Sequence, residues 1–424
     1  MIHKLIYIIG QKIRNPSIKS IFSFLKKTEK WSLNELENYQ LEKVNELLDF
    51  AIKYSTFYKE KYKDVNVKIN SLEDLKKLPY LNKEELLKNA LSIQTTYSFK
   101  KVFKAVTSGT SGNSLTFFRD EFSDSFNRAS INRGYSWHSV QPWNKNGYFW
   151  GFNFTFYKKI KTSLLDLLQN RFRVFSYEEK EFNKFVRKLK NARYIHGYSS
   201  MIYQTARLIN QNKLPKPKNL KMIKGTSEKI YDNYQNEILS AFGKRIINEY
   251  GATESGIIGF ECAYGSIHIN MEGVIVEVID NEILITNLQM KSFPIIRYKL
   301  GDYVELASDK KCKCGLEHKI IKEITGRIGK NIYGINNIYP SLYFYYIFKN
   351  LDKIKNIKLN YKIVQKEKGK LEFFIEEHLS DINNKYLISE IEKYFKQDIS
   401  FIINDGSNVF SKKKKTTSFT SYLE

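Results

Sequence analysis

Apolar residues recur with a helical period over the N-terminal part of the chain. A capping-box pattern at Ser32 and Glu35 marks the start of the clearest helix, and its apolar positions follow at helical spacing: Leu36, Val44, Leu47, Leu48 and Ala51. Ser71 and Asn82, each followed three residues later by an acidic residue, indicate two further helix starts. We therefore expect this region to be helical.

The opening segment, Met1–Gly10, is mostly apolar and also predicts a helix. It lacks the small-residue cleavage site of a secretory signal. Three basic residues follow it: Lys12, Arg14 and Lys19. Two placements are open, a helix packed on the body of the protein or a basic amphipathic helix in contact with a membrane surface. The pattern favours the first.

From Lys101 onward the pattern changes to strands and helices. Strands are predicted at Val102–Val106 and Leu115–Phe118, on either side of a glycine-rich turn. Helices and strands then alternate, with helices over 182–189 and 201–209 and strands over 221–223 and 246–247. This alternation predicts an α/β architecture.

Strands dominate the stretch that follows. Val274–Ile279 and Ile283–Thr286 predict a hairpin joined at Asp280 and Asn281, and Tyr298–Leu306 predicts another strand. The last part of the chain predicts an α+β unit, with alternation over 357–363, strands over 371–375 and 399–403, and a helix over 387–395.

At 424 residues, the chain is too long for one ordinary core. We expect two domains. The first, over 1–325, is a large α/β domain of sheets and helices with a β-rich subdomain. The second, over 326–424, is a small α+β domain.

Composition narrows the class of protein. With 42% hydrophobic residues and no apolar run of membrane-spanning length, the chain is expected to be globular. Three cysteines cannot form a disulfide framework, which favours the cytoplasm, including the inner face of the membrane if the opening helix binds lipid. The net charge of +24 comes from lysines spread along the whole chain, so it indicates a compositional bias rather than a nucleic-acid partner.

A turn rich in glycine and hydroxyl residues lies between the two strands after Lys101. It consists of Thr107, Ser108, Gly109, Thr110, Ser111 and Gly112. Such a turn can direct several backbone N–H groups inward as an anion nest, and its hydroxyls can donate hydrogen bonds to phosphate. It is not a Walker A loop, because the Gly-Lys-Ser/Thr ending is missing and a strand follows in place of a helix. An ordinary hairpin turn is the alternative.

The segment Tyr250–Glu254 combines an aromatic ring, a hydroxyl and a carboxylate. Tyr250 can stack on adenine, Thr253 can contact a phosphate oxygen, and Glu254 can hold Mg²⁺, which prefers carboxylates together with phosphate oxygens. A helix start capped by Thr253 and Glu254 is the alternative. The two motifs in this order indicate an enzyme that uses ATP with its metal.

Several other segments fall in the order of a known family: Thr56–Tyr58, Ser71–Lys83, His196–Ser199, Glu261–Cys262, Ile267–Asn270, Thr286–Leu288 and Gly326–Arg327. The most specific match is Phe293–Asp302. Through these segments nearly the whole chain resembles the adenylate-forming enzymes, and within them the phenylacetate–coenzyme A ligase branch that includes CapK-like capsular-polysaccharide biosynthesis members.

The resemblance implies an ATP-dependent carboxylate ligase. A carboxylate attacks the α-phosphate of ATP to give an acyl-adenylate and pyrophosphate, and coenzyme A or an amine then displaces AMP. It implies that residues 107–112 form the phosphate loop and that the adenine-binding residues are Thr226, Ser227, Glu228, Tyr250 and Gly251. Thr253 matches the phosphate contact, Glu254 the Mg²⁺ ligand, and Asp302 and Arg327 the ribose contacts.

The resemblance also implies that the small domain over 326–424 is mobile. It places a catalytic lysine in the basic tail of that domain, at Lys415, with Lys414 as the reserve match; a solvated tail is the alternative. Two positions depart from the family pattern. Asn113 stands where many members carry a lysine, and Gly329 stands where the family has an acidic hinge residue. The acyl acceptor therefore stays open between coenzyme A and an amine.

The three cysteines and one histidine form a candidate zinc set: Cys262, His268, Cys312 and Cys314. Three thiolates and an imidazole suit a closed tetrahedral structural site. His318 is an alternative fourth ligand, and unrelated thiol loops beside a packed histidine are the alternative to a metal site.

Three functions are compatible with these observations. The leading one is a carboxylate ligase of capsular or other surface-polysaccharide synthesis; the others are a catabolic aryl- or acyl-coenzyme A ligase and a degenerate ATP-binding partner protein. Aromatic residues around 135–156, with 196–199 and 223–226, predict the acid pocket and favour an apolar or ring-shaped acid. No pattern in the sequence predicts an oligomeric state.

Overall fold

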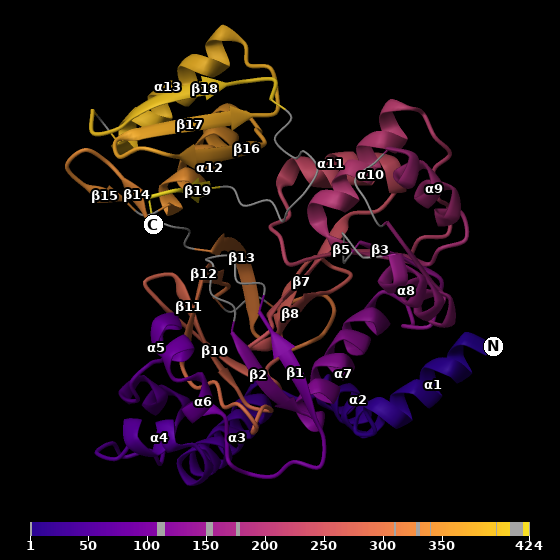
Figure 1. Cartoon of the computed structure of the whole chain (residues 1–424), viewed down its shortest axis with the longest axis vertical. Coiled ribbons are helices and arrows are strands. Elements are labelled where there is room, and N and C mark those ends of the chain that lie inside the picture. The colour runs from indigo at the N-terminus through magenta and orange to yellow at the C-terminus, as the bar shows by residue number, and fades with distance from the viewer. Residues whose placement is uncertain are drawn as a thin grey trace.

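The computed structural model describes residues 2–107, 115–149, 156–174, 179–308, 311–327, 331–339, 341–395, 397–407 and 419–423. These residues form a large body of helices around one long sheet, and a smaller C-terminal unit with its own sheet (Figure 1). The predicted α/β class, with a large N-terminal and a small α+β C-terminal domain, is confirmed.

Helices make up the N-terminal part: α1 (Ile2–Arg14), α2 (Ile18–Thr28), α3 (Leu33–Tyr54), α4 (Thr56–Lys61), the 3₁₀ helix η1 (Leu72–Lys77), α5 (Lys83–Lys88) and α6 (Ala90–Ile93). The predicted capping box is present, since the Glu35 N–H donates to the Ser32 hydroxyl at 3.3 Å and the Ser32 N–H donates to the Glu35 carboxylate at 2.8 Å. The opening segment is helical, as predicted. However, α1 buries none of its residues, so its packing on the body is partial.

A separate antiparallel hairpin follows, made of β1 (Val102–Val106) and β2 (Thr116–Asp120). Both predicted strands are present. The second extends to Asp120, where the side chain accepts a hydrogen bond from the Ser123 N–H at 2.9 Å and begins helix α7 (Glu121–Trp137). Residues 108–114, between the two strands, lie outside the described residues.

The large sheet has 11 strands in the order β10-β11-β12-β13-β9-β8-β7-β6-β5-β3-β4. They are β3 (Asn146–Phe149), β4 (Arg171–Arg173), β5 (Tyr194–Tyr198), β6 (Met222–Thr226), β7 (Ile246–Ala252), β8 (Gly256–Glu261), β9 (Ile267–Ile269), β10 (Val274–Ile279), β11 (Glu282–Asn287), β12 (Tyr298–Leu306) and β13 (Ile320–Arg327). Neighbours from β4 to β7 are parallel, whereas neighbours from β7 to β10 are antiparallel. The predicted hairpin of β10 and β11 is confirmed, with Asp280 and Asn281 at φ of +52° and +64°.

The parallel strands are covered on both faces, because alternate residues of a strand point to opposite sides. Ile195, Ile223 and Ile246 pack in one apolar cluster with α9 (Glu179–Leu189), α10 (Ser199–Gln211) and α11 (Asp232–Phe242). Their sequence neighbours Tyr194, Met222 and Ile247 pack with Tyr135 of α7 in another cluster. Helix α8 (Phe156–Leu168) lies between β3 and β4 in the chain.

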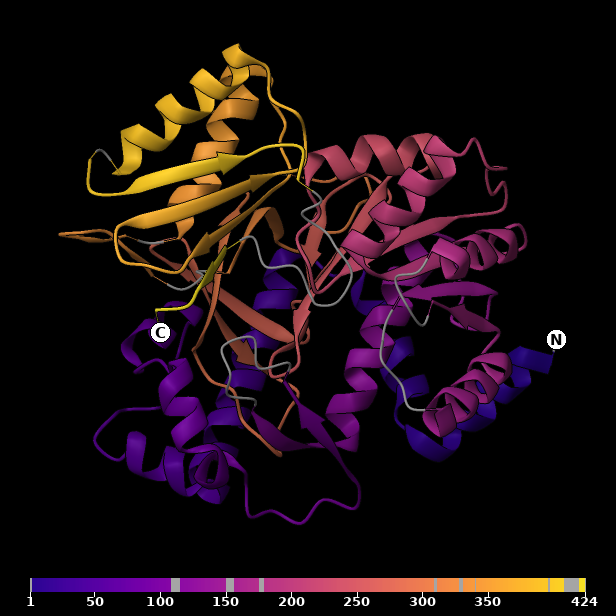
Figure 2. The same ribbon diagram turned by 45° about the horizontal axis from the view of Figure 1, so that its top comes forward.

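The C-terminal unit has a four-stranded sheet in the order β18-β17-β16-β19 and an apolar core of its own (Figure 2). Its elements are β14 (Ile332–Tyr333), β15 (Ile338–Tyr339), α12 (Leu342–Lys355), β16 (Tyr361–Gln365), β17 (Lys370–Ile375), α13 (Asp381–Phe395), β18 (Ser400–Asn404) and β19 (Phe419–Ser421). The strand predicted over 357–363 begins only at Tyr361, because Asn356, at φ of +53°, ends α12 and Ile357 hydrogen-bonds back to Leu351. The boundary between 325 and 326 falls inside β13 and stays a prediction.

Candidate functional site

The parallel strands β5, β6 and β7 lie next to one another in the large sheet, so their carboxyl ends are neighbours. Thr226, the last residue of β6, pairs with Tyr198 of β5 and with Glu249 of β7. Open parallel sheets bind ligands at such strand ends. Because Glu249 directly precedes Tyr250, the predicted adenine-lining segment lies next to the predicted adenine-stacking ring.

Ser227 and Glu228 lead the chain out of β6. Ser227 adopts a φ of +65°, a left-handed conformation that is uncommon outside glycine. Glu228 accepts a hydrogen bond from the Ser200 N–H at 2.9 Å, in the first turn of α10, where a carboxylate is favourable. Lys229 donates to the Thr325 carbonyl at 3.3 Å, so this turn is tied to β13. Glu228 thus positions the turn, whatever its role toward a ligand.

Tyr250 and Asp302 are brought together from β7 and β12. The Tyr250 hydroxyl donates a hydrogen bond to Oδ2 of Asp302 at 2.8 Å, and both residues are buried. An ionised carboxylate has about four acceptor positions, so this bond leaves capacity for further donors. Two of the residues predicted to bind one nucleotide are therefore in direct contact.

Thr253 and Glu254 lie in the turn between β7 and β8. The alternative interpretation of this segment, a helix start, is wrong, because Ala252 ends one strand and Gly256 begins the next. The Arg119 guanidinium, from β2, donates to the Thr253 carbonyl. The Glu254 side chain is buried. The hairpin that carries the glycine-rich turn is thereby held against the acidic segment.

Thr107 closes the base of the glycine-rich turn. Its N–H donates to the Leu115 carbonyl at 2.9 Å, and its hydroxyl accepts from the Leu115 N–H at 2.9 Å. The predicted phosphate-loop residues Ser108, Gly109, Thr110, Ser111 and Gly112 lie outside the described residues, as do Lys414 and Lys415.

Arg327 and Asp302, the two predicted ribose contacts, are register partners on the adjacent strands β13 and β12. Gly326 precedes Arg327 with a φ of +102°, a conformation that only glycine adopts readily. The backbone thus brings the last strand of the large sheet to the Tyr250–Asp302 pair.

A buried polar and aromatic cluster lies along β3, β5 and β6, close to the strand ends. His196 Nε2 is 3.2 Å from Asn146 Oδ1, and the His196 ring stacks on Tyr148 at 4.5 Å between centroids. Lys224 forms an ion pair with Glu249, and its ammonium is 5.2 Å from the Tyr135 ring centroid. Burial first, and then the charge of Lys224, hold the pKa of His196 well below its ordinary value, so the imidazole is neutral.

Residues from all three segments predicted to line the acid pocket, 135–156, 196–199 and 223–226, therefore come together in this cluster. Lys224 was predicted only as part of the segment 223–226, and no role was predicted for Glu249 or Arg119. The one signal for an internal ion pair was the position of Lys224 directly after the apolar residues Met222 and Ile223 of a predicted strand, because a buried lysine requires a partner. Arg119 carried no such signal.

The four candidate zinc ligands converge. Single ligand atoms of Cys262, His268, Cys312 and Cys314 all lie within 4.8 Å of one another. The sulfurs of Cys262 and Cys312 are 3.6 Å apart, and Cys314 Sγ is 3.1 Å from His268 Nε2. Tetrahedral zinc with Zn–S bonds of about 2.3 Å places two sulfurs about 3.8 Å apart, so the set fits that ion. The loops that carry the thiols are therefore neighbours in space, and the metal itself stays a prediction.

His318 is not the fourth member of this set. Its Nε2 is 3.0 Å from Oε1 of Glu272, which also pairs with Arg133 at 2.6 Å. The His318 carbonyl instead lies 3.3 Å from Nδ1 of His268 and leaves Nε2 of that ring toward the thiols. Metal-bound histidines commonly have such a partner on the other ring nitrogen.

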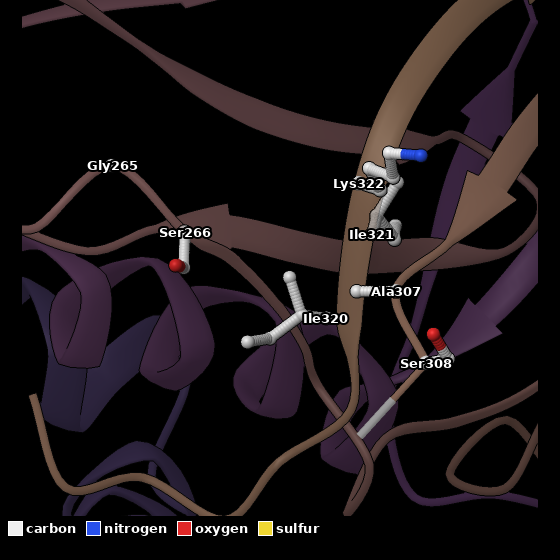
Figure 3. A pocket seen from close by; sticks show the side chains of 7 residues that line it. All are labelled: Gly265, Ser266, Ala307, Ser308, Ile320, Ile321 and Lys322. Carbon is white, nitrogen blue, oxygen red and sulfur yellow. The ribbon is translucent and has the colours of Figure 1, made fainter. Parts of the chain in front are cut away.

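A pocket of about 500 Å³ is lined in part by Ser266, whose carbonyl accepts a hydrogen bond from the Cys262 N–H at 2.9 Å (Figure 3). It is lined by residues of the β8–β9 turn and of β12–β13: Gly265, Ser266, Ala307, Ser308, Ile320, Ile321 and Lys322. Its cation, Lys322, pairs with Glu305 at 2.5 Å. None of the predicted nucleotide-binding residues that the structure describes lines this pocket, so we do not assign the nucleotide to it.

No family model matches the chain. Among solved structures, 2-hydroxyisobutyryl-CoA ligase in the postadenylation state, in complex with R3-HIB-AMP, has a TM-score of 0.71 at 14% identity, over 94% of this chain and 92% of that chain. The same ligase in an open conformation, in complex with 2-HIB-AMP and CoA, has a TM-score of 0.60 at 14% identity, over 93% of each chain. The chain therefore shares the fold of 2-hydroxyisobutyryl-CoA ligase.

In sequence, the chain is similar to Protein CapK of Staphylococcus aureus. The two are 25% identical over 316 residues, which cover 69% of this chain and 68% of that protein. This similarity supports the resemblance to the CapK-like branch that the motifs predicted, and the solved ligase structures support the predicted fold.

Proposed function

We propose that the chain is an ATP-dependent ligase that activates a carboxylic acid as an acyl-adenylate and transfers the acyl group to coenzyme A or an amine. The observation that carries this proposal is the contact between Tyr250, near the carboxyl end of β7, and Asp302 of the antiparallel strand β12. Arg119 of the β1–β2 hairpin, which carries the glycine-rich turn, donates a hydrogen bond to the carbonyl of Thr253, directly after β7. The adenylate-forming fold is consistent with this use of the site.

Each of the predicted nucleotide-binding residues has its own proposed contact with ATP. Asp302 accepts hydrogen bonds from the ribose hydroxyls while the Tyr250 hydroxyl holds its carboxylate in place. Arg327 is the second proposed ribose contact, and residues 226–228 with Tyr250 and Gly251 border the adenine. Thr253 and the turn Thr107–Gly112 contact the phosphates. Donors held in a fixed arrangement lower the barrier to attack on phosphorus, because they match the charge that develops there.

Glu254 is the proposed ligand of Mg²⁺, consistent with a buried carboxylate beside the phosphate-binding hairpin. When bound there, Mg²⁺ would supply positive charge that offsets the phosphate charge and favours the departure of pyrophosphate. Lys415 is the proposed catalytic lysine, contributed by the small domain over 326–424.

Coenzyme A is the first acceptor to test, because 2-hydroxyisobutyryl-CoA ligase, which shares the fold, was solved with 2-HIB-AMP and CoA. An amine on a surface-polysaccharide precursor is the second, in line with the similarity to CapK. We place the enzyme in the cytoplasm, in the synthesis of capsular or related surface polysaccharide. A catabolic ligase differs in accepting only coenzyme A.

The test is exchange of labelled pyrophosphate into ATP with Mg²⁺ and a panel of aliphatic and aromatic acids. We expect exchange with at least one acid, followed by thioester or amide formation when coenzyme A or an amine is added. ATP binding without exchange or AMP release across the panel would instead identify a non-catalytic ATP-binding protein.

We further propose a structural zinc ion at Cys262, His268, Cys312 and Cys314. Their separations support it, as does the orientation of the His268 ring. Such an ion would join the β8–β9 hairpin to the segment before β13, close to the hinge between the domains. Closed sites of this kind stabilise the fold rather than take part in the reaction.

A further inference from the structure

Helix α1 exposes a row of large apolar side chains. Ile2, Leu5, Ile9 and Ile13 recur at helical spacing and are between 48% and 72% exposed. Tyr7, on the opposite side of the helix, packs against Trp143 and hydrogen-bonds with Asn132. One side of α1 is thus attached to the body, whereas its apolar side meets solvent.

Helix α8 has a second row of the same kind. Its exposed side chains recur at helical spacing: Tyr157, Ile160, Leu164, Leu167 and Leu168. The two helices lie at one corner of the molecule in both views (Figures 1 and 2). His3 Nδ1 of α1 is 3.2 Å from the carbonyl oxygen of Leu168, so the two rows are neighbours although they are far apart in the chain.

The charges around these two rows are almost all positive. α1 contains no acidic residue, and its exposed Lys12 flanks the apolar row. Its other exposed cations, Lys4 and Arg14, lie over the rings of Trp143 and Phe103 on the attached side of the helix. α8 carries exposed Lys159 and Lys161. Its single acidic residue, Asp166, is buried and bonded to Arg173 at 2.7 Å. The face therefore combines an apolar surface with cations and offers no exposed carboxylate from either helix.

We propose that α1 and α8 together form a docking face for the surface of an anionic lipid bilayer. The apolar rows enter the boundary between headgroups and acyl chains, and the lysines contact lipid phosphates. The exposed ring of Tyr157 suits that boundary. None of the helices in the described part of the chain combines the length and the apolar character needed to span a bilayer, so the contact is peripheral.

The charges favour lipid over a second copy of this chain. In a symmetric dimer the same patch meets itself, and here cations would face cations. An anionic membrane provides the opposite charge over the whole face. The proposal is independent of the ligase activity, because no residue of the nucleotide site lies on α1 or α8.

The test is sedimentation of the full chain with vesicles of phosphatidylcholine alone or mixed with phosphatidylglycerol. We expect binding to the anionic vesicles that weakens as salt rises above about 0.1 M. Leu5→Gln with Leu164→Gln should weaken the partition by about tenfold or more. Lys12→Gln with Lys161→Gln should weaken it by about tenfold. Leu91→Gln, at a leucine that is 95% exposed on α6, is the matched control and should bind normally.

Absence of binding to the phosphatidylglycerol vesicles would overturn the proposal, as would binding that neither double variant weakens. Gel filtration gives the third outcome. A dimer that Leu5→Gln with Leu164→Gln dissociates, without vesicle binding by the parent chain, would assign the face to self-association. All substituted residues are exposed, and an unchanged thermal midpoint of each variant shows that the fold is retained.

Discussion

The Tyr250 hydroxyl donates a hydrogen bond of 2.8 Å to Oδ2 of Asp302, and this bond joins the end of β7 to β12. Both side chains are buried, so the bond is shielded from water and fixes the orientation of the carboxylate. A carboxylate held in this way can accept hydrogen bonds from the two hydroxyls of a ribose. The pair therefore connects the predicted adenine and ribose contacts.

We expect Tyr250→Phe to raise the KM for ATP about five- to tenfold with little change in kcat, because one neutral donor to the carboxylate is lost and the ring remains. Asp302→Asn should lower kcat/KM for ATP by about a hundredfold, since bonds to a charged acceptor are lost. Pyrophosphate exchange at varied ATP measures both. Tyr264→Phe, at an exposed tyrosine, is the control. An unchanged KM for ATP in both site variants would contradict the ribose role.

The proposed role of Glu254 as the ligand of Mg²⁺ can be tested separately. We expect Glu254→Gln to reduce pyrophosphate exchange by about a hundredfold or more, because the amide cannot neutralise and hold Mg²⁺ as a carboxylate does. The Mg²⁺ concentration for half-maximal activity should rise in parallel. Glu73→Gln, at an exposed carboxylate, should leave both quantities unchanged. Normal Mg²⁺ dependence in Glu254→Gln would remove this residue from the metal site.

The catalytic lysine is tested by comparing neighbouring residues of the tail. We expect Lys415→Ala to lower the rate of adenylation by about a hundredfold or more, since a cation aimed at the α-phosphate is lost. Transfer from a supplied acyl-adenylate to the acceptor should be affected much less. Lys414→Ala should keep most of the adenylation rate. The opposite result would assign the role to Lys414.

Local signals in the sequence predicted most of the fold. The capping box at Ser32 and the turn at Asp280 and Asn281 depend on residues a few positions apart, and both formed as expected. The start of β16 was predicted too early, because alternation over 357–360 could not reveal the left-handed cap at Asn356. Propensity and spacing describe neighbours along the chain, and they do not locate such a cap.

Contacts between distant segments were not predictable in the same way. The residue types of Tyr250 and Asp302 matched a family pattern, but their direct hydrogen bond needed the strand order. The interactions of Arg119 with Thr253 and of Arg133 with Glu272 join residues more than a hundred positions apart. Nothing in the local sequence marks those pairings. The cysteine set was recognisable because so few cysteines are present that all of them could be considered together.

Zinc content tests the Cys262–Cys314 cluster. We expect about one zinc per purified chain, and Cys312→Ser should lose most of it and lower the thermal midpoint, because a closed tetrahedral site contributes directly to folding. Lys313→Ser changes the exposed residue between the two cysteines and should keep both metal and stability. Elemental analysis with thermal unfolding measures the two effects. Metal-free parent protein with the same midpoint as Cys312→Ser would contradict the site.

Glu272 makes the buried connection between α7 and the β9–β10 region, through Arg133 at 2.6 Å and His318 at 3.0 Å. Burial alone would raise the pKa of Glu272, but the charge of Arg133 and then that of His318 outweigh it and hold this pKa well below its ordinary value. Because the folded-state pKa is depressed, the stability from Glu272 is present above the unfolded-state pKa of about 4.3 and is lost as pH falls below it.

We therefore expect Glu272→Gln to lower the free energy of unfolding at pH 7 by about 3 to 5 kcal/mol, since it leaves the Arg133 charge buried without its partner. Urea unfolding at pH 7 and at about pH 4 provides the measurement. Between pH 7 and pH 4 the parent chain should lose more stability than Glu272→Gln. Only in the parent does the unfolded state bind a proton at residue 272 that the folded state does not bind. Glu60→Gln, at an exposed ion pair, should follow the parent at both pH values. Equal acid sensitivity in the parent and Glu272→Gln would show that Glu272 contributes nothing to the acid dependence.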